Sequence, residues 1–151
     1  MRRIALLSAA TMASLLATGA RGEAVISDAW VRAMPPTQSM TAGYLKLDNT
    51  GTRAITIVGA SSDASPRVEI HNTVTRDGLQ RMQPVASLEI AAGESIELAP
   101  GSYHLMLREM PAMPAEGDRG ELCLELDSDE RLCSEARVAR SGAQAPSHQH
   151  H

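Results

Sequence analysis

The sequence predicts an all-β fold, an antiparallel sandwich or barrel built from short strands. Apolar and polar residues alternate with period two over most of the chain, which is the pattern of strands with one buried face. Glycine, proline, asparagine and aspartate interrupt this alternation at regular intervals, as turns between strands do. No long segment carries the apolar stripe of an amphipathic helix, and no internal repeat is visible.

The first five expected strands occupy residues 25–32, 42–49, 54–61, 67–71 and 79–82. Turn residues Asn49-Thr50-Gly51 separate the second strand from the third, and Arg76-Asp77-Gly78 separate the fourth from the fifth. In the fourth strand Val68 and Ile70 share one face, which we expect to be the core face. In the short fifth strand we expect Leu79 to be the core residue.

The other five expected strands occupy residues 88–90, 95–98, 103–109, 120–126 and 132–139. Turn signals lie at Ala92-Gly93-Glu94 and at Pro100-Gly101. The core must be aliphatic, because the chain has no Phe, one Trp and two Tyr. We expect Trp30 and Tyr44 to pack between the sheets.

The two cysteines fall in the last expected hairpin. Pairing Cys123 with Cys133 leaves a loop of residues 127–129 and places both side chains on the same outer face. Directly opposed strand residues have the spacing that a disulfide needs. We therefore expect a disulfide, with a metal-binding thiol pair or two unpaired thiols as the alternatives.

The ends of the chain differ from the expected β domain, which covers residues 25–140. Residues 1–24 resemble a cleaved signal peptide, because Arg2 and Arg3 precede an apolar run that is shorter than the roughly 20 residues of a membrane span. Residues 141–151 form a small, polar, His-bearing tail that we expect to be disordered. The chain has 14 basic and 18 acidic residues with no basic cluster, so we expect no nucleic-acid partner.

Four residues suggest a chemical function: His71, Met82, His104 and Met106, spaced H-x10-M-x21-H-x-M. Imidazole and thioether are neutral donors that lean to soft metals, and this set suits Cu(I) better than Zn(II), Mg(II) or Ca(II). A lone His or Met is more often a surface or packing residue. Thioethers can hold Cu(I) and still release it to an incoming thiolate, which favours handing the metal on.

Strand alternation predicts the direction of these side chains. Because Leu105 and Leu107 take the core face, His104 and Met106 should point away from the core. By the same argument His71 should face outward beside Glu69, and Met82 can share a face with Gln80. The sequence therefore predicts one exposed metal site.

With these residues the chain resembles the periplasmic Cu(I) chaperones of the PCuAC type, whose motif has the same ligands at the same two long spacings. Further resemblance lies in residues 29–36, 42–45, 68–71, 100–107 and 116–118. The resemblance implies a cupredoxin-like β-sandwich that binds Cu(I) near its surface. It also implies delivery of copper toward the dinuclear copper centre of cytochrome c oxidase, alongside a Sco-type thiol protein.

The expected function is thus a periplasmic, monomeric copper chaperone that has no catalytic residues and is not an enzyme. Copper storage or detoxification by the same site is the main alternative. An electron-transfer cupredoxin is a weaker one, because a blue-copper site needs a Cys ligand with two His, and the hairpin occupies both cysteines. No H-E-x-x-H, P-loop or nucleophile-elbow motif points to an enzyme.

A few other residues could bind metal. The tail residues His148, His150 and His151 could capture Cu(II), or they could be the remains of a purification tag. Met34 and Met40 flank a proline-bearing loop and could approach the site. We expect Met110 and Met113 to be packing residues.

Overall fold

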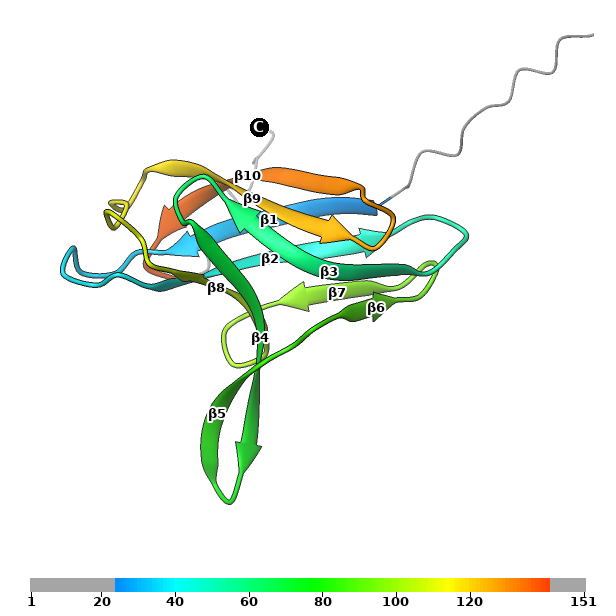
Figure 1. Ribbon diagram of the computed structural model, residues 1–151, viewed down its shortest axis with the longest axis horizontal. Helices are drawn as coiled ribbons and strands as arrows, with labels where there is room; N and C mark the ends of the chain where they lie inside the picture. Colours follow the sequence, from blue (N-terminus) through cyan, green and yellow to red (C-terminus); the bar gives the residue numbers. More distant parts are fainter. Residues whose placement is uncertain (1–23, 142–151) are drawn as a thin grey trace, which may run out of the picture.

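The computed structural model describes residues 24–141, and within them the chain forms ten strands and no helix. The expected signal segment and His-bearing tail lie outside the described residues, apart from Ala24 and Ser141. Figure 1 shows the strands in two layers, with one hairpin extending away from them. The strands are β1 (Ala24–Arg32), β2 (Thr41–Asn49), β3 (Ile55–Ser62), β4 (Arg67–Arg76), β5 (Leu79–Pro84), β6 (Leu88–Ile90), β7 (Ser95–Leu98), β8 (Tyr103–Arg108), β9 (Arg119–Leu126) and β10 (Arg131–Ala139).

The strands join in the order β5-β4-β8-β2-β1-β10-β9-β3-β6, with β7 added to β2 beside β8. All pairs are antiparallel except β1 with β10, which is parallel. The predicted all-β sandwich is confirmed, and each predicted strand is present. No helix of the described chain has the length and apolar character needed to cross a membrane.

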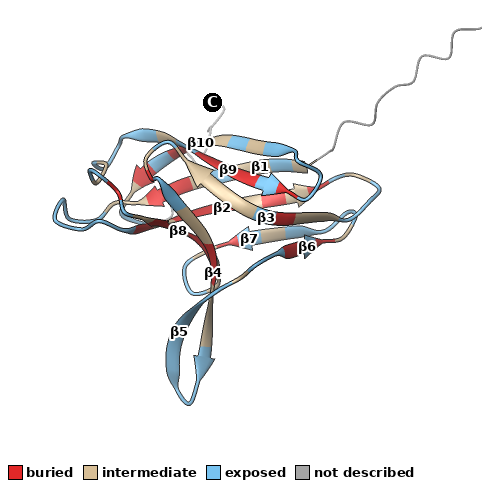
Figure 2. Ribbon diagram, in the orientation of Figure 1, coloured by how far each residue is buried: buried red, intermediate tan, exposed pale blue. Residues whose placement is uncertain are grey.

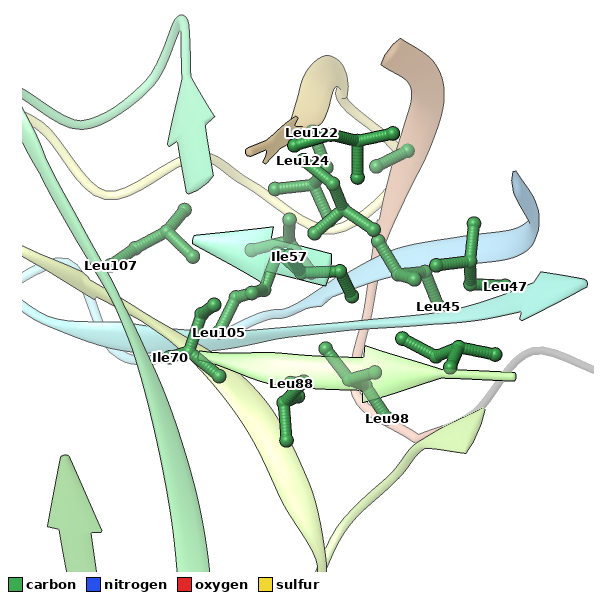
Figure 3. Close-up of a cluster of buried hydrophobic side chains, with 14 of the residues drawn as sticks. Leu45, Leu47, Ile57, Ile70, Leu88, Leu98, Leu105, Leu107, Leu122 and Leu124 are labelled. Atoms are coloured by element: carbon green, nitrogen blue, oxygen red, sulfur yellow. The ribbon is translucent and has the colours of Figure 1, made fainter. Parts of the chain in front are cut away.

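The core lies between the layers and is almost entirely aliphatic. Leucines of β2 and β8 face leucines of β9, with Ile57 of β3 between them (Figure 3). Gly43 in β2 permits this close approach, because a Cβ there would lie 3.1 Å from Leu122 and 3.2 Å from Leu107. Burial of this apolar surface is the main force that holds the two layers together.

The hairpin β4–β5 departs furthest from the expected layout. β4 continues five residues beyond the predicted end at residue 71, and β5 pairs only with β4. Asp77 and Gly78 turn the chain with φ angles of 54° and 73°, as a two-residue turn with two left-handed positions requires. Every residue of β5 is exposed (Figure 2). The expectation that Leu79 is a core residue is therefore wrong, because no second layer covers the hairpin.

A bulge in β1 corrects the expected place of Trp30. Ser27 pairs with Lys46 but Trp30 pairs with Tyr44, so two residues of β1 oppose one of β2. The extra residue moves Trp30 from the core face to the outer face of the sheet. Trp30 and Tyr44 are buried there and contact each other with ring centroids 4.5 Å apart, outside the aliphatic core cluster. The expectation that both pack between the sheets is therefore wrong.

The C-terminal hairpin agrees with its prediction. Cys123 and Cys133 are directly opposed in β9 and β10, and a disulfide joins them. The Leu126 N–H donates to the carbonyl oxygen of Glu130, which leaves residues 127–129 as the loop. The alternatives of a metal-binding thiol pair and of unpaired thiols do not hold in this structure.

The position of the core leads us to expect that replacing two different leucines by Ala changes the free energy of unfolding by very different amounts. Replacing fully buried Leu105 by Ala should lower the free energy of unfolding by about 2–5 kcal/mol, because it removes packed methyl groups and leaves a cavity. The same change at Leu79, which is 61% exposed, should shift it by less than about 0.5 kcal/mol. Urea denaturation of both variants with the disulfide intact measures this. Equal losses would contradict the assignment of the core.

Candidate metal centre

Strand register brings the four candidate ligands onto one face of the strands β5, β4 and β8. His71 of β4 lies directly opposite His104 of β8, and Met106 lies opposite Glu69, two residues before His71. On the other edge of β4, Met82 pairs with Thr73, two residues after His71. Diagonal neighbours of this kind are roughly 7–8 Å apart at the backbone, within reach of long side chains.

The face was predicted correctly, but the exposure of the imidazoles was not. His104 and Met106 lie on the face opposite Leu105 and Leu107, which are fully buried in the core. His104 is nevertheless only 2% exposed and His71 only 9%. A strand alternation shows which face a side chain takes, but not whether neighbouring side chains cover that face. Met82 is the exposed member of the set, at 59%, and Met106 is half-buried.

Each imidazole has one nitrogen that forms a hydrogen bond and one nitrogen that has no hydrogen-bond partner. His71 Nε2 donates to Glu69 Oε2 at 2.9 Å, and His104 Nδ1 donates to the carbonyl oxygen of Ser102 at 3.0 Å. The other nitrogens, His71 Nδ1 and His104 Nε2, are buried and have no hydrogen-bond partner. Their lone pairs are therefore available, and this arrangement is typical of metal-binding histidines, whose second nitrogen is held by a carboxylate or a carbonyl.

The two rings stand close enough to share one ion. Their centroids are 5.8 Å apart and their planes are inclined by 55°. A metal–imidazole nitrogen bond is about 2 Å long, so this centroid distance is compatible with both rings binding a single ion. Together with the thioethers of Met82 and Met106, they offer two nitrogen and two sulfur donors.

Glu69 positions His71, and two arginines position Glu69. Arg67 contacts Glu69 Oε1 at 2.6 Å, and Arg108 contacts Oε2 at 3.4 Å. The hydrogen bond from His71, with these guanidinium contacts, lowers the pKa of Glu69 to about 2. The carboxylate is thus ionised at any physiological pH and accepts the hydrogen bond from His71 Nε2–H, which leaves Nδ1 without a proton.

His104 is held in its neutral form. Burial lowers its pKa, the hydrogen bond to the Ser102 carbonyl opposes this, and electrostatic interactions with His71 and Arg32 lower the pKa further. A neutral ring is the form that binds metal. Position and protonation state therefore both favour His104 as a ligand.

The sequence analysis placed Glu69 beside His71 but did not assign it the role of orienting the ring. That role could have been found, because residues at i and i+2 of a strand share a face and a carboxylate is a common partner of a metal-binding His. The carbonyl of Ser102 gives no signal in the sequence. Met110 and Met113 are packing residues as predicted, since both belong to the core cluster or contact it.

Among the described residues, one further group of His, Cys, Asp or Glu could be considered for a metal. It consists of Glu121, Cys123 and Cys133. Its two sulfurs are joined in the disulfide and cannot act as thiolate ligands. Met34 and Met40 are exposed in the loop between β1 and β2. The tail residues His148, His150 and His151 lie outside the described residues.

Solved copper-binding domains share this fold. A copper-bound PCuAC domain from PmoF2 matches with a TM-score of 0.64 and 20% identity, over 78% of this chain and 92% of that domain. The Cu(I)-bound solution structure of DR1885 from Deinococcus radiodurans matches with a TM-score of 0.62 and 27% identity, over 77% of each chain. The predicted cupredoxin-like fold is confirmed by these neighbours.

Curated relatives match part of their own length. A lipoprotein of Leifsonia xyli subsp. xyli is 38% identical over 95 residues, which cover 62% of this chain and 56% of the relative. An uncharacterized protein of Rickettsia prowazekii is 28% identical over 102 residues, 67% of this chain and 56% of the relative. The chain thus spans about half the length of the curated relatives it matches. A model of the LpqE-like lipoprotein family matches residues 24–138, and the chain therefore belongs to the LpqE-like family.

Proposed function

We propose that the protein is a copper chaperone that binds Cu(I) through His71 Nδ1, His104 Nε2 and the sulfurs of Met82 and Met106. One observation carries the proposal: two buried imidazole nitrogens, on opposed strands, both have a lone pair and no partner. Unpartnered buried polar atoms are rare in folded proteins and call for an explanation. A soft monovalent ion held by nitrogen and thioether donors supplies one.

The placement of the donors suits transfer of the ion. The two histidines lie in the covered part of the site, whereas Met82 lies on the exposed hairpin β4–β5 (Figure 2). A partner's thiolate can therefore approach from the side of Met82, take the place of its sulfur, and accept the ion before the imidazoles release it. Neutral, protein-held ligands of moderate strength favour such an exchange over tight storage.

The proposed destination is the dinuclear copper centre of cytochrome c oxidase, with a Sco-type thiol protein as a second partner, as the PCuAC resemblance implies. The lipoprotein description of the family supports an exported protein and so a periplasmic site of action. Storage or detoxification by the same ligands is the second candidate function. The disulfide between Cys123 and Cys133 argues against a blue-copper electron carrier, because no free thiolate remains in the described chain.

Conservative methionine variants test the ligand set. Replacing Met106 by Leu keeps the volume and removes the sulfur, so Cu(I) affinity should fall by at least roughly tenfold while the fold is retained. Competition with a chromophoric Cu(I) chelator measures the affinity. Met110 is the matched control, because it is buried in the core and should leave the affinity unchanged when replaced by Leu. Identical affinities in both variants would exclude Met106 as a ligand.

Glu69 should matter although it does not bind the ion. The change Glu69→Gln removes the charge that fixes the His71 proton on Nε2, and loss of such a partner typically lowers metal affinity by roughly 10- to 100-fold. The control is Glu109→Gln, because Glu109 also pairs with Arg67 but does not contact His71. The same chelator competition measures the Cu(I) affinity of both variants. An unchanged affinity in Glu69→Gln would show that His71 does not need Glu69 in order to bind the ion.

Acid should release the ion. Imidazole binds metal only when neutral, and because the pKa of His104 lies below its usual 6.5, its proton competes only on the acidic side of that value. We expect a constant Cu(I) affinity near neutral pH and a steep decline below about pH 6. Chelator titrations across this range give the profile. A flat profile down to about pH 4, where thioethers alone would still bind, would rule out the histidines.

A further inference from the structure

Arg32, at the end of β1, places a positive charge beside the proposed copper site. Arg32 Nε is the third buried side-chain nitrogen of the described residues that has no hydrogen-bond partner, and the other two are the free nitrogens of His71 and His104. All three atoms belong to residues on the same face of the sheet. A guanidinium is unexpected there, because it repels the cation that the site would bind.

Strand register puts Arg32 on the face that carries the ligands. Val31 pairs with Gly43 on the core face, so the next residue, Arg32, points to the opposite face, as does Ala42, the partner of Met106. The guanidinium carbon of Arg32 lies 5.5 Å from the ring centroid of Tyr44, which in turn contacts Trp30. The aromatic pair thus holds Arg32 at the edge of the site.

No carboxylate of residues 24–141 forms an ion pair with this guanidinium. None of the ion pairs among the described residues includes Arg32, whereas Arg67 and Arg108 both contact Glu69. Tyr44 does not supply a negative charge either, because burial raises the pKa of its phenol, although the neighbouring Arg32 partly offsets this.

We propose that Arg32 makes the site selective for monovalent over divalent metal ions. Coulomb repulsion is proportional to the charge of the ion, so a fixed guanidinium disfavours Zn(II) or Cu(II) twice as strongly in free energy as Cu(I). The neutral ligands add no charge that could compensate. This inference rests on the proposed function, since it concerns the same ligands, and it assigns to Arg32 the role of a specificity-determining residue that does not touch the ion.

Because the repulsion is proportional to the charge of the ion, the effects of removing Arg32 on Cu(I) and Zn(II) affinity should be related quantitatively. If removal of the charge strengthens Cu(I) binding by a given factor, Zn(II) binding should strengthen by the square of that factor. A unit charge within roughly 10 Å, at the effective dielectric constant of a protein surface, corresponds to a factor on the order of ten for Cu(I) and a hundred for Zn(II). A purely structural role, in which Arg32 only packs on Tyr44, would weaken both metals together.

The test uses the full chain with Arg32→Gln, which removes the charge but keeps an N–H donor, and with Arg32→Lys, which keeps the charge. Arg32→Leu is the second neutral variant if Arg32→Gln fails to fold, as judged by thermal unfolding. Arg81→Gln is the matched control, because Arg81 is exposed on β5 and opposes Val74, away from the ligand face. Competition with a chelator measures the Cu(I) affinity. The Zn(II) affinity is measured by titration while the imidazole NMR signals of His71 and His104 are followed, so that binding at other histidines does not contribute to the result.

We expect the neutral variant to bind Zn(II) at least tenfold more tightly relative to Cu(I) than the wild type does. The Lys variant and the Arg81 control should keep the wild-type ratio. Equal shifts for both metals, or the same ratio in the Gln and Lys variants, would overturn the role of the charge while leaving the chaperone proposal intact. A wild-type protein that binds no Cu(I) would instead overturn the proposed function.

Discussion

The antiparallel pairing of β4 with β8 is the constraint on which the site depends. It sets His71 directly against His104 and sets Met106 beside Glu69, although these residues are far apart in the chain. A slip of one residue would turn one set of side chains to the opposite face and separate the donors. The aliphatic core prevents that slip, because Ile70, Leu105 and Leu107 occupy the alternate positions of the same strands and are buried. Folding energy and site geometry therefore come from opposite faces of one strand pair.

The arrangement of the two histidines lowers the stability of the metal-free protein. A buried nitrogen without a partner typically costs roughly 1–3 kcal/mol, and the two imidazoles present one each. The network of Arg67, Arg108 and Glu69 holds one ring, and a backbone carbonyl holds the other, so neither can turn to satisfy its free nitrogen. An ion that binds both nitrogens removes that cost. Protonation is the competing way to satisfy them, and the burial of His104 opposes it.

Much of this arrangement could be predicted from the sequence, and the errors have identifiable causes. The alternation of apolar and polar residues correctly predicted the strands, the paired cysteines and the face of each candidate ligand, because these features follow from a local pattern with a period of two. It failed for Trp30, since one bulge residue reverses the alternation without a visible break in the pattern. It failed for Leu79 and for the exposure of both histidines, because burial depends on what lies over a face, which only the tertiary structure defines. The carbonyl of Ser102 could not be predicted at all, since every residue has one.

The hairpin β4–β5 would give an ion held at the proposed site a preferred route of release. Beyond Asn72, β4 has left β8 and is paired along its length only with β5, and two-stranded ribbons are marginally stable on their own. Local opening of this ribbon exchanges faster than unfolding of the sandwich, because few apolar contacts must break. Met82 therefore belongs to this ribbon, whereas the other three proposed donors belong to the paired strands β4 and β8. If an ion leaves the proposed site by this route, its residence time depends on how often the ribbon opens, and substitutions there would change it without weakening the sandwich.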